Sequence, residues 1–447
     1  MTQSPLFPLP EPQPAGSAPP TSLEHARVVR PDRQQLAWMP RDLGAALPPD
    51  HAARAIWDFL EQLDLSAFYG SIKAVLEGPG RPTTDPQVLL ALWLLATTEG
   101  IGSARQLARL CEEHDAYRWL CGGVPINYHM LADFRTAQQA ALDDLLTQIV
   151  ASLMAAGAVT LERVAQDGVR VRASAGAASF RRKDTLDGCL REARAQVTRL
   201  AEERERPDAH GVSARQQAAR ERAARERVAR VEQALAYLPK AQATKETQQR
   251  RYAHAKRERV TAARVSTTDP EARVMKMADG GFRPAYNVQF ATDGAHGVIV
   301  GVAVTGAGTD AGQTGPMVEQ IVRRTGGCPG DYLVDGGYAT RDDITGLEGQ
   351  GVTVYAPVRT PRNKPDEERH EPRWGDSPEV ARWRQRMASD AAKAVYRQRG
   401  AIAEWTNAQA RQHGLGQFNV RGVVNATSVA LLLAIAHNGL RWIGLRT

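Results

Sequence analysis

The apolar positions of this chain change their period along its 447 residues, and each period predicts a different kind of structure. Over residues 50–149 apolar residues recur at i, i+3 and i+4, as in HAARAIWDFLEQLDL and PQVLLALWLLATTEG, which predicts helices. From residue 164 the period becomes two, because in VAQDGVRVRASA the side chains of Asp167, Val169 and Val171 share one face. We therefore expect a helical domain over residues 46–155, followed by a strand that carries an acid among apolar neighbours.

More runs of strand length come after it. They read FRPAYNVQFATD, GVIVGVAVTG, DYLVDGG and VTVYAPV, and the helical stretches AGQTGPMVEQIVRR and RDDITGLEGQ separate the later ones. Strands in succession, and then strands that alternate with helices, are typical of a mixed sheet with helices packed on it. The fold class predicted for residues 156–447 is α/β.

A long helical segment over residues 185–260 interrupts this pattern. Its apolar stripe is thin, with Val228, Val231, Leu235 and Leu238 in a 3-4-3 spacing. Residues 211–264 hold 14 Lys and Arg against 5 Asp and Glu, so 14 − 5 = +9, more than the +7 of the whole chain. Two interpretations stay open: a solvated helical hairpin whose charge has no partner, or an arm that dimerises or tracks DNA.

Composition limits the remaining choices. An apolar fraction of 43% and a charged fraction of 24% are those of a soluble globular protein, and the longest apolar run, VALLLAIA, is too short to cross a membrane. Residues 1–21 hold seven prolines, so we expect a disordered tail over residues 1–45 without a secretory signal. The four cysteines show no zinc-binding spacing, which favours a reducing cytoplasm, and the pI near 9.3 is compatible with a polyanionic partner.

Three carboxylates are candidates for a metal site. Asp167 lies within the first strand, Asp335 ends the apolar run YLVD just before two glycines, and Glu404 lies on a helical stretch near the C-terminus. Oxygen ligands of this kind suit two Mg²⁺ ions, with Mn²⁺ as a substitute, and two such ions can hold the attacking and leaving oxygens of a phosphoryl displacement. The spacing along the chain does not by itself prove that the three carboxylates converge.

Glu404 belongs to the pattern Y-x2-R-x4-E-x6-R, formed with Tyr396, Arg399 and Arg411. On a regular helix Glu404 and Arg411 lie about 20° apart around the axis and roughly 10 Å apart along it. An acid and a cation on one helix face suit a phosphodiester held by a metal, with the acid on the metal and the arginine on a phosphate. A solvated helix face with charges of both signs is the alternative interpretation.

Several blocks taken together resemble a known family. YHMLADFR, QDGVRVRAS, STTDPEARVMK, YNVQFATD, YLVDGGYAT and YRQRGAIAEWTNAQAR occur in the order found in bacterial insertion-sequence transposases of the DDE class with the Y-R-E signature. The resemblance covers about residues 50–445. In two respects the chain departs from the family pattern: the last signature position is Arg411 where Lys is usual, and four residues rather than three separate Arg399 from Glu404.

The resemblance implies a ribonuclease-H-like catalytic domain over residues 156–447, with the helical insertion at 185–260 and an irregular insertion at 359–390. It implies that Asp167, Asp335 and Glu404 are the catalytic metal ligands, and that Tyr396, Arg399 and Arg411 lie near the transferred phosphate. The helical domain would bind DNA ends. The partners would be double-stranded DNA, as terminal repeats and target, and further copies of the chain in a homodimer or larger complex. No membrane is implied, and the protein would be cytoplasmic, associated with the nucleoid.

Two other functions remain open. One is a metal-dependent nuclease that cuts DNA without joining it, and the other is a non-catalytic DNA-binding or coiled-coil assembly protein built on the basic segment. Trp374 and Trp383, in an Arg-rich and Pro-rich stretch, are either packed side chains or, as in relatives, aromatics that stack on a displaced base. The ten histidines show neither metal spacing nor a triad pattern, so a hydrolase of that kind has no support.

Overall fold

The structure, a computed structural model, describes residues 42–70, 72, 83–205, 213–250, 262–359 and 366–445. The chain divides into two units after Asp42, and the described helices and strands all belong to the second unit, Leu43–Thr447. The tail predicted over residues 1–45 falls outside the described residues up to residue 41.

Short helices make up the N-terminal part, as the apolar period predicts. Their caps are ordinary: Asp85 accepts a hydrogen bond from the backbone N–H of Gln87 at the start of α3, and Gly122 ends α5 with a φ of 55°. The elements are η1 (Gly44–Ala46), α1 (Ala52–Leu60), α2 (Ser66–Tyr69), α3 (Pro86–Thr98), α4 (Ala104–Glu113), α5 (Asp115–Cys121), α6 (Tyr128–Ala137) and α7 (Gln139–Ala155).

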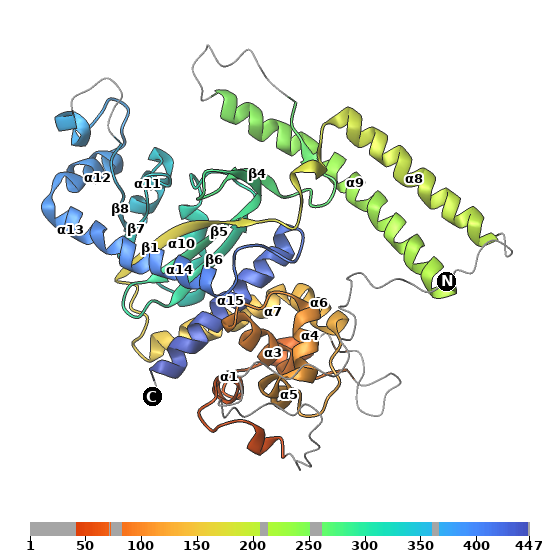
Figure 1. Ribbon diagram of the computed structural model, residues 1–447. Coiled ribbons are helices and arrows are strands. Elements are labelled where there is room, and N and C mark those ends of the chain that lie inside the picture. The colour runs from red at the N-terminus through yellow and green to blue at the C-terminus, as the bar shows by residue number, and fades with distance from the viewer. Residues whose placement is uncertain are drawn as a thin grey trace, which may run out of the picture. The chain divides into compact units, whose positions relative to one another are not determined.

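A mixed sheet forms the centre of the remaining chain (Figure 1). Strand β1 (Arg163–Arg172) pairs antiparallel with β5 (Phe282–Asp293) on one side and parallel with β7 (Asp331–Leu333) on the other. The parallel strand β8 (Thr353–Tyr355) lies beyond β7, while β4 (Arg273–Lys276) and β6 (Ile299–Thr305) share the outer edge of β5. The predicted mixed sheet is therefore confirmed. A small second sheet pairs β2 (Phe180–Arg181) with β3 (Val265–Ser266), next to η2 (Ala177–Ser179).

Helices of the C-terminal half cover the sheet. They are α10 (Thr314–Thr325), α11 (Arg341–Gly349), η4 (Asp366–His370), α12 (Pro378–Ala388), α13 (Asp390–Arg399), a π-helical turn (Gly400–Glu404), α14 (Trp405–Gln412) and α15 (Val423–Gly444). The segment 359–390, expected to be irregular, contains the regular helix α12, because Ser377 caps its first turn and Val380, Trp383 and Met387 form a buried stripe. Residues 360–365 of that segment lie outside the described residues.

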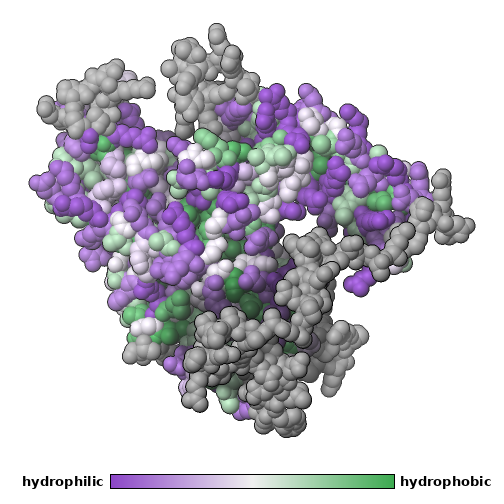
Figure 2. All heavy atoms as spheres, in the orientation of Figure 1, coloured by the Kyte–Doolittle hydropathy of each residue, from purple (hydrophilic) through white to green (hydrophobic). Residues whose placement is uncertain are grey.

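The basic segment forms two helices, α8 (Lys183–Glu205) and α9 (Ala214–Arg250), that lie side by side (Figure 1). Figure 2 shows hydrophilic residues over most of this hairpin on the visible face. Residues 206–212 and 251–261 lie outside the described residues. A separate small apolar cluster fixes the base of the hairpin to the strand β3; it consists of Leu186, Ala234, Ala241, Ala263 and Val265.

Helix α15 packs against α3, α7 and β6, so one continuous apolar core contains side chains of the N-terminal helices and of the sheet. Among the described residues α15 alone is long and apolar enough to cross a membrane by length and composition, and 67% of its most apolar window is buried inside the structure. Burial of this kind is what the core helix of a packed domain shows.

Candidate active site

The strand β1 supplies the first carboxylate. Asp167 Oδ1 accepts a hydrogen bond from the backbone N–H of Gly168 (2.9 Å), and Oδ2 accepts one from Nδ2 of Asn407 (3.0 Å). Its side chain is 19% exposed. At Gly168 a Cβ would lie 2.7 Å from Oδ1 of Asn287 and 2.9 Å from Oδ1 of Asp310, so only glycine fits beside this aspartate.

The second carboxylate lies on the neighbouring parallel strand. β7 ends at Leu333, so Asp335 stands in the loop just beyond it, where its Oδ1 accepts a hydrogen bond from the N–H of Gly337 (2.6 Å). The register pairs Arg163 with Asp331, and Asp167 and Asp335 each come four residues after their member of that pair. Adjacent strands are about 4.8 Å apart, so both carboxylates reach the same edge of the sheet.

A helical run from Asp390 to Gln412 carries the third carboxylate, and this run contains a π-helical turn at Gly400–Glu404. Ala403 of that turn is buried against Ala165 of β1 and Leu333 of β7, which brings Glu404 to the edge that carries the two aspartates. The sequence pattern predicted a regular helix here, so the π turn is a difference from that expectation.

The π turn accounts for the unusual spacing in the signature. Arg399 and Glu404 are five residues apart, which in a regular α-helix would place them about 140° apart around the axis. A π turn closes its hydrogen bonds between residues five apart, so it returns the chain to the same face after five residues instead of four. The inserted residue is thereby absorbed, and the two side chains meet.

Arg399 joins the carboxylates. Its Nη1 lies 3.4 Å from Oδ2 of Asp167, and its Nη2 lies 3.6 Å from Oε1 of Glu404. The guanidinium is 14% exposed, whereas the Glu404 side chain is 66% exposed. Burial acts to lower the pKa of Arg399, but the negative charge of Asp167 and the side chain of Tyr396 outweigh it, so the pKa is raised.

Five of the six predicted residues are thus linked. Asp167, Arg399 and Glu404 are in direct contact, Tyr396 acts on Arg399, and the charge of Asp335 acts on both Asp167 and Arg399. Arg411 is the exception: it lies exposed in the last turn of α14, and within the described residues no side-chain contact connects it to the other five.

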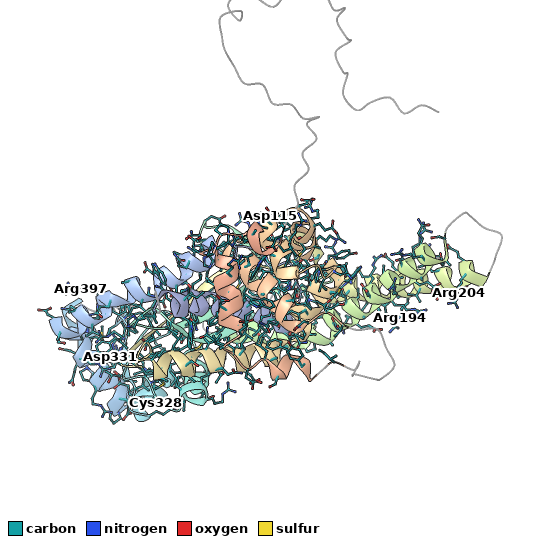
Figure 3. The ribbon with its side chains drawn as sticks, turned by 90° about the horizontal axis from the view of Figure 1, so that it is seen from below. Asp115, Arg194, Arg204, Cys328, Asp331 and Arg397 are labelled. Atoms are coloured by element: carbon teal, nitrogen blue, oxygen red, sulfur yellow. The ribbon has the colours of Figure 1, made fainter. Side chains whose placement is uncertain are left out.

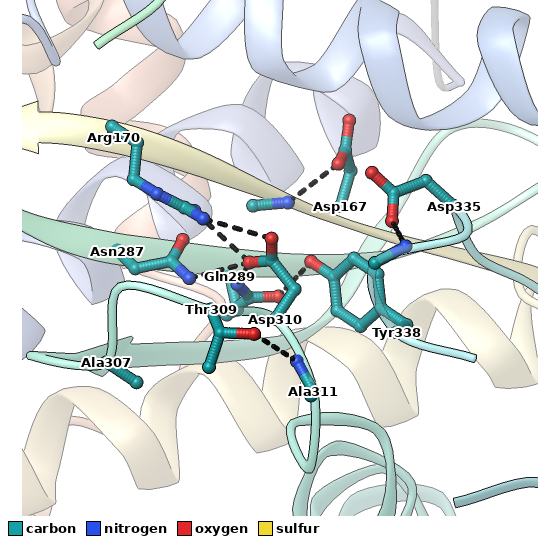
Figure 4. A network of polar contacts seen from close by, with 12 residues as sticks. Asp167, Arg170, Asn287, Gln289, Ala307, Thr309, Asp310, Ala311, Asp335 and Tyr338 are labelled. Carbon is teal, nitrogen blue, oxygen red and sulfur yellow. Dashed lines mark hydrogen bonds and ion pairs between the residues drawn. The ribbon is translucent and has the colours of Figure 1, made fainter. Parts of the chain in front are cut away.

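A polar network supports this edge of the sheet (Figure 4), and it joins Asn287 and Gln289 of the block YNVQFATD to residues that the sequence patterns did not identify. Asp310, in the loop after β6, accepts hydrogen bonds from Asn287 Nδ2 (2.7 Å) and Gln289 Nε2 (3.0 Å) and forms an ion pair with Arg170 (3.0 Å). The hydroxyl of Tyr338, three residues after Asp335, donates to Oε1 of Gln289. In the sequence, polar residues on one face of β1 and β5 could have indicated the strand part of this network. No sequence pattern indicates the loop residue Asp310.

Burial and charge make Asp167 the carboxylate that most needs a cation. Burial raises its pKa, and the charge of Asp335 raises it further, against the opposing effects of Arg399 and the Gly168 N–H. The three predicted ligands offer only carboxylate oxygens, which is the donor set of hard divalent cations, so they fit the implied magnesium. Among the described residues, however, no group of three or more acids, histidines or cysteines is arranged to hold a metal ion, and Arg399 contacts both Asp167 and Glu404.

The two tryptophans in the stretch before α13 differ in their surroundings. Trp383 of α12 is 4% exposed and packs in the core, so its expected alternative role in stacking on a base loses support. Trp374 precedes α12 and is 99% exposed.

A mixed sheet that gathers acids and an arginine at one edge defines an α/β protein with a carboxylate site. Two segments of the chain match family models: residues 41–137 match a Transposase domain (DUF772), and residues 260–438 match a Transposase DDE domain. The second segment includes Asp335 and Glu404, whereas Asp167 precedes it. No curated protein and no solved structure matches the chain. The two family matches support a DDE-type transposase.

Proposed function

We propose that this protein is a DNA transposase that cleaves DNA at the ends of an insertion sequence and joins the freed 3′ ends to target DNA, with magnesium as cofactor. The observation that carries the proposal is the meeting of Asp167, Arg399 and Glu404 beside Asp335, from two parallel strands and one helix. Residues 237 positions apart in the sequence, Asp167 and Glu404, contact the same guanidinium.

Asp167, Asp335 and Glu404 would hold two Mg²⁺ ions, or Mn²⁺ in their place. Divalent cations bound there would supply charge stabilisation to the phosphodiester and activate the attacking oxygen. Asn407 keeps the Asp167 carboxylate oriented by its hydrogen bond to Oδ2. The Arg399 guanidinium, which contacts Asp167 and Glu404, could also pair with a phosphate through two hydrogen bonds.

Tyr396 and Arg411 complete the proposed phosphate-binding set. Tyr396 acts on Arg399 from the preceding turn of α13, and Arg411 is exposed on α14, which leaves its fork of donors accessible to a DNA backbone. A central strand with the first acid, a parallel neighbour with the second and a helix with the third support a ribonuclease-H-like core. Two DNA ends would require at least two copies of the chain, so a homodimer or larger complex is part of the proposal.

The direct test is cleavage of a DNA substrate that carries the inverted repeats flanking the gene. Asp167→Asn, Asp335→Asn and Glu404→Gln should each lower the rate by about 10³-fold or more, because each removes a charged ligand of the proposed metal ions. Asp342→Asn, at an exposed position of α11, is the matched control and should cut at the wild-type rate. Chelation of divalent cations should stop cleavage, and thermal melting would show that the variants are folded. Wild-type rates in any of the three variants would refute the assignment.

A second assay separates a transposase from a nuclease that cannot join DNA. Pre-cleaved ends with free 3′-hydroxyls, incubated with a supercoiled target and Mg²⁺, should yield strand-transfer products. Cleavage without joining would assign the protein to the nuclease class, and neither activity would leave a DNA-binding or assembly role.

A further inference from the structure

A cavity lined by basic side chains lies where the α8–α9 hairpin meets the edge of the large sheet. Its volume is about 610 Å³, and its lining comes from α9, from the two segments that flank the small sheet, from β4 and from the loop after β6. The charged residues of the lining are Arg182, Lys245, Arg264 and Arg273, and none of the described residues that line the cavity is acidic. The cavity thus gathers the side chains of three arginines and one lysine.

The three arginines of the cavity differ from several arginines farther along the hairpin. Five of those arginines form ion pairs with four glutamates: Arg194 with Glu232, Arg204 and Arg225 with Glu221, Arg227 with Glu192, and Arg230 with Glu226. Figure 3 shows Arg194 and Arg204 along this part of the hairpin. In the part of the chain that the structure describes, Arg182, Arg264 and Arg273 form no ion pair. The cavity at the base of the hairpin therefore brings the side chains of three arginines without ion pairs together.

The base of the hairpin is held in place by the surrounding structure. The Ala263 N–H donates to Oε1 of Gln242 (2.8 Å), and the buried side chains of Ala241, Ala263 and Val265 belong to one apolar cluster. Arg264 lies between the last two of these residues, so its backbone is fixed although its side chain is exposed. A cationic site on a fixed backbone loses less conformational freedom when it binds an anion.

Mutual repulsion among the cations favours an anionic ligand. Burial lowers the pKa of Lys245, and the positive charges of Arg182 and Arg264 lower it further. Apart from these cations the lining is made mostly of Ala, Gly and Thr, with Phe180 and Val274 as the large apolar residues. It lacks the convergent hydrogen-bonding groups by which small-molecule pockets recognise a base or a metabolite, so it recognises charge.

We propose that this cavity binds backbone phosphates of double-stranded DNA at a site separate from the catalytic edge of the sheet. The proposal rests on the proposed function, which makes DNA the polyanion that the protein meets. β4 pairs with β5, and β5 pairs with β1, so two strand spacings, roughly 10 Å, separate the cavity's edge strand from the strand of Asp167. A duplex engaged at the active site is thus within reach of the cavity, which adds affinity that does not depend on base sequence.

The test is the salt dependence of binding to a short duplex of arbitrary sequence, measured by fluorescence anisotropy between roughly 50 and 200 mM salt. Arg182→Gln with Arg264→Gln removes two exposed, unpaired charges. Each lost phosphate contact lowers the slope of log Kd against log salt by about 0.9, so the double variant should lose about 1 to 2 units of slope. Arg182→Lys with Arg264→Lys keeps the charge and should keep the wild-type slope. Arg225→Gln with Arg227→Gln is the matched control on the ion-paired part of α9, and it should also keep that slope.

Four results would overturn the inference. The first is an unchanged slope in the Arg182/Arg264 glutamine variant, and the second is an equal loss of slope in the Arg225/Arg227 control. The third is a loss of slope in the lysine variant equal to that of the glutamine variant. The fourth is a preference of the wild type for anionic vesicles or single-stranded RNA that depends on the same two arginines. A wild type that binds no duplex would refute the proposed function itself. A wild type that cleaves its ends, together with an unaffected glutamine variant, would refute only the cavity.

Discussion

At the scale of single residues, the pKa values of Asp310 and Asp167, two aspartates near the same edge of the sheet, are shifted in opposite directions. Burial alone would raise the pKa of Asp310, but Arg170 and Asn287 outweigh it, so the pKa lies below the usual 3.8. The pKa of Asp167 is raised instead, since burial and Asp335 outweigh its donors. A carboxylate whose charged form is already stabilised by its partners is a structural residue, whereas one whose charged form stays disfavoured can take a cation.

Asp310→Asn should therefore destabilise the protein rather than abolish a metal site. The change leaves Arg170 without its ion pair in a half-buried position, at a cost of roughly 2 to 3 kcal/mol. The depressed pKa means that this contribution is present above about pH 4 and is lost as the pH falls below it. Urea unfolding at neutral pH would measure the loss, with Asp342→Asn as the exposed control. Equal midpoints for Asp310→Asn and wild type would contradict the assigned role.

At the scale of elements, the helical run Asp390–Gln412 joins two regular helices through one π turn. The first helix presents Tyr396 and Arg399, and the second continues from Glu404 towards Arg411. Because π turns add one residue to a helix without changing its partners on the sheet, the turn keeps Arg399 and Glu404 in contact despite the extra residue. The π turn as a whole, rather than any single side chain, therefore sets the relative positions of Tyr396, Arg399 and Glu404.

Changing the length of this turn tests the argument. Deletion of Ala401 leaves Arg399 and Glu404 four residues apart, the spacing at which a regular α-helix keeps them on one face. We expect this deletion to retain measurable cleavage. Insertion of one alanine after Ala401 turns Glu404 about 100° away from Arg399 and should lower the cleavage rate by about 10²-fold or more. Circular dichroism would check that both proteins are folded, and similar rates for both would contradict the role of the turn.

The sequence predicts features that depend on neighbouring residues better than features that depend on contacts between distant segments. The alternation in FRPAYNVQFATD predicted β5 with its observed bounds, Phe282–Asp293, because a strand that pairs on both edges and is buried has a strong local pattern. The π turn could not be predicted, since Ala401, Ala403 and Glu404 favour a regular α-helix equally well and Ala403 packs on the sheet only in the folded chain. Asp310 escaped notice because its partners Arg170, Asn287 and Gln289 lie on two strands that only the fold brings together.

At the scale of the whole molecule, α15 connects what the sequence divided into two domains. The period change near residue 156 predicted a helical domain separate from the α/β part, yet α15 packs on α3 and α7 as well as on β6. An ion pair between Arg324 of α10 and Asp143 of α7 adds a second connection, with the Arg324 side chain 2% exposed. The helices and the sheet therefore share one core, and we expect them to unfold together.

His437 provides a probe of that shared core. It lies on α15, 3% exposed, with Nε2 at 2.8 Å from the carbonyl oxygen of Gly297 and its ring against Trp405. Burial lowers its pKa from 6.5 to about 4, so between these values the unfolded chain binds a proton that the folded chain does not, and stability falls as the pH falls. From pH 7 to about pH 4 the free energy of unfolding falls by about 3 kcal/mol.

His437→Gln keeps a hydrogen-bond donor but cannot titrate. Its urea midpoints, measured across this pH range, should therefore change less than those of the wild type, whether unfolding of the N-terminal helices or of the sheet is followed. His129→Gln, at an exposed position, should leave the wild-type pH dependence unchanged, and a parallel pH dependence in His437→Gln would show that another group titrates.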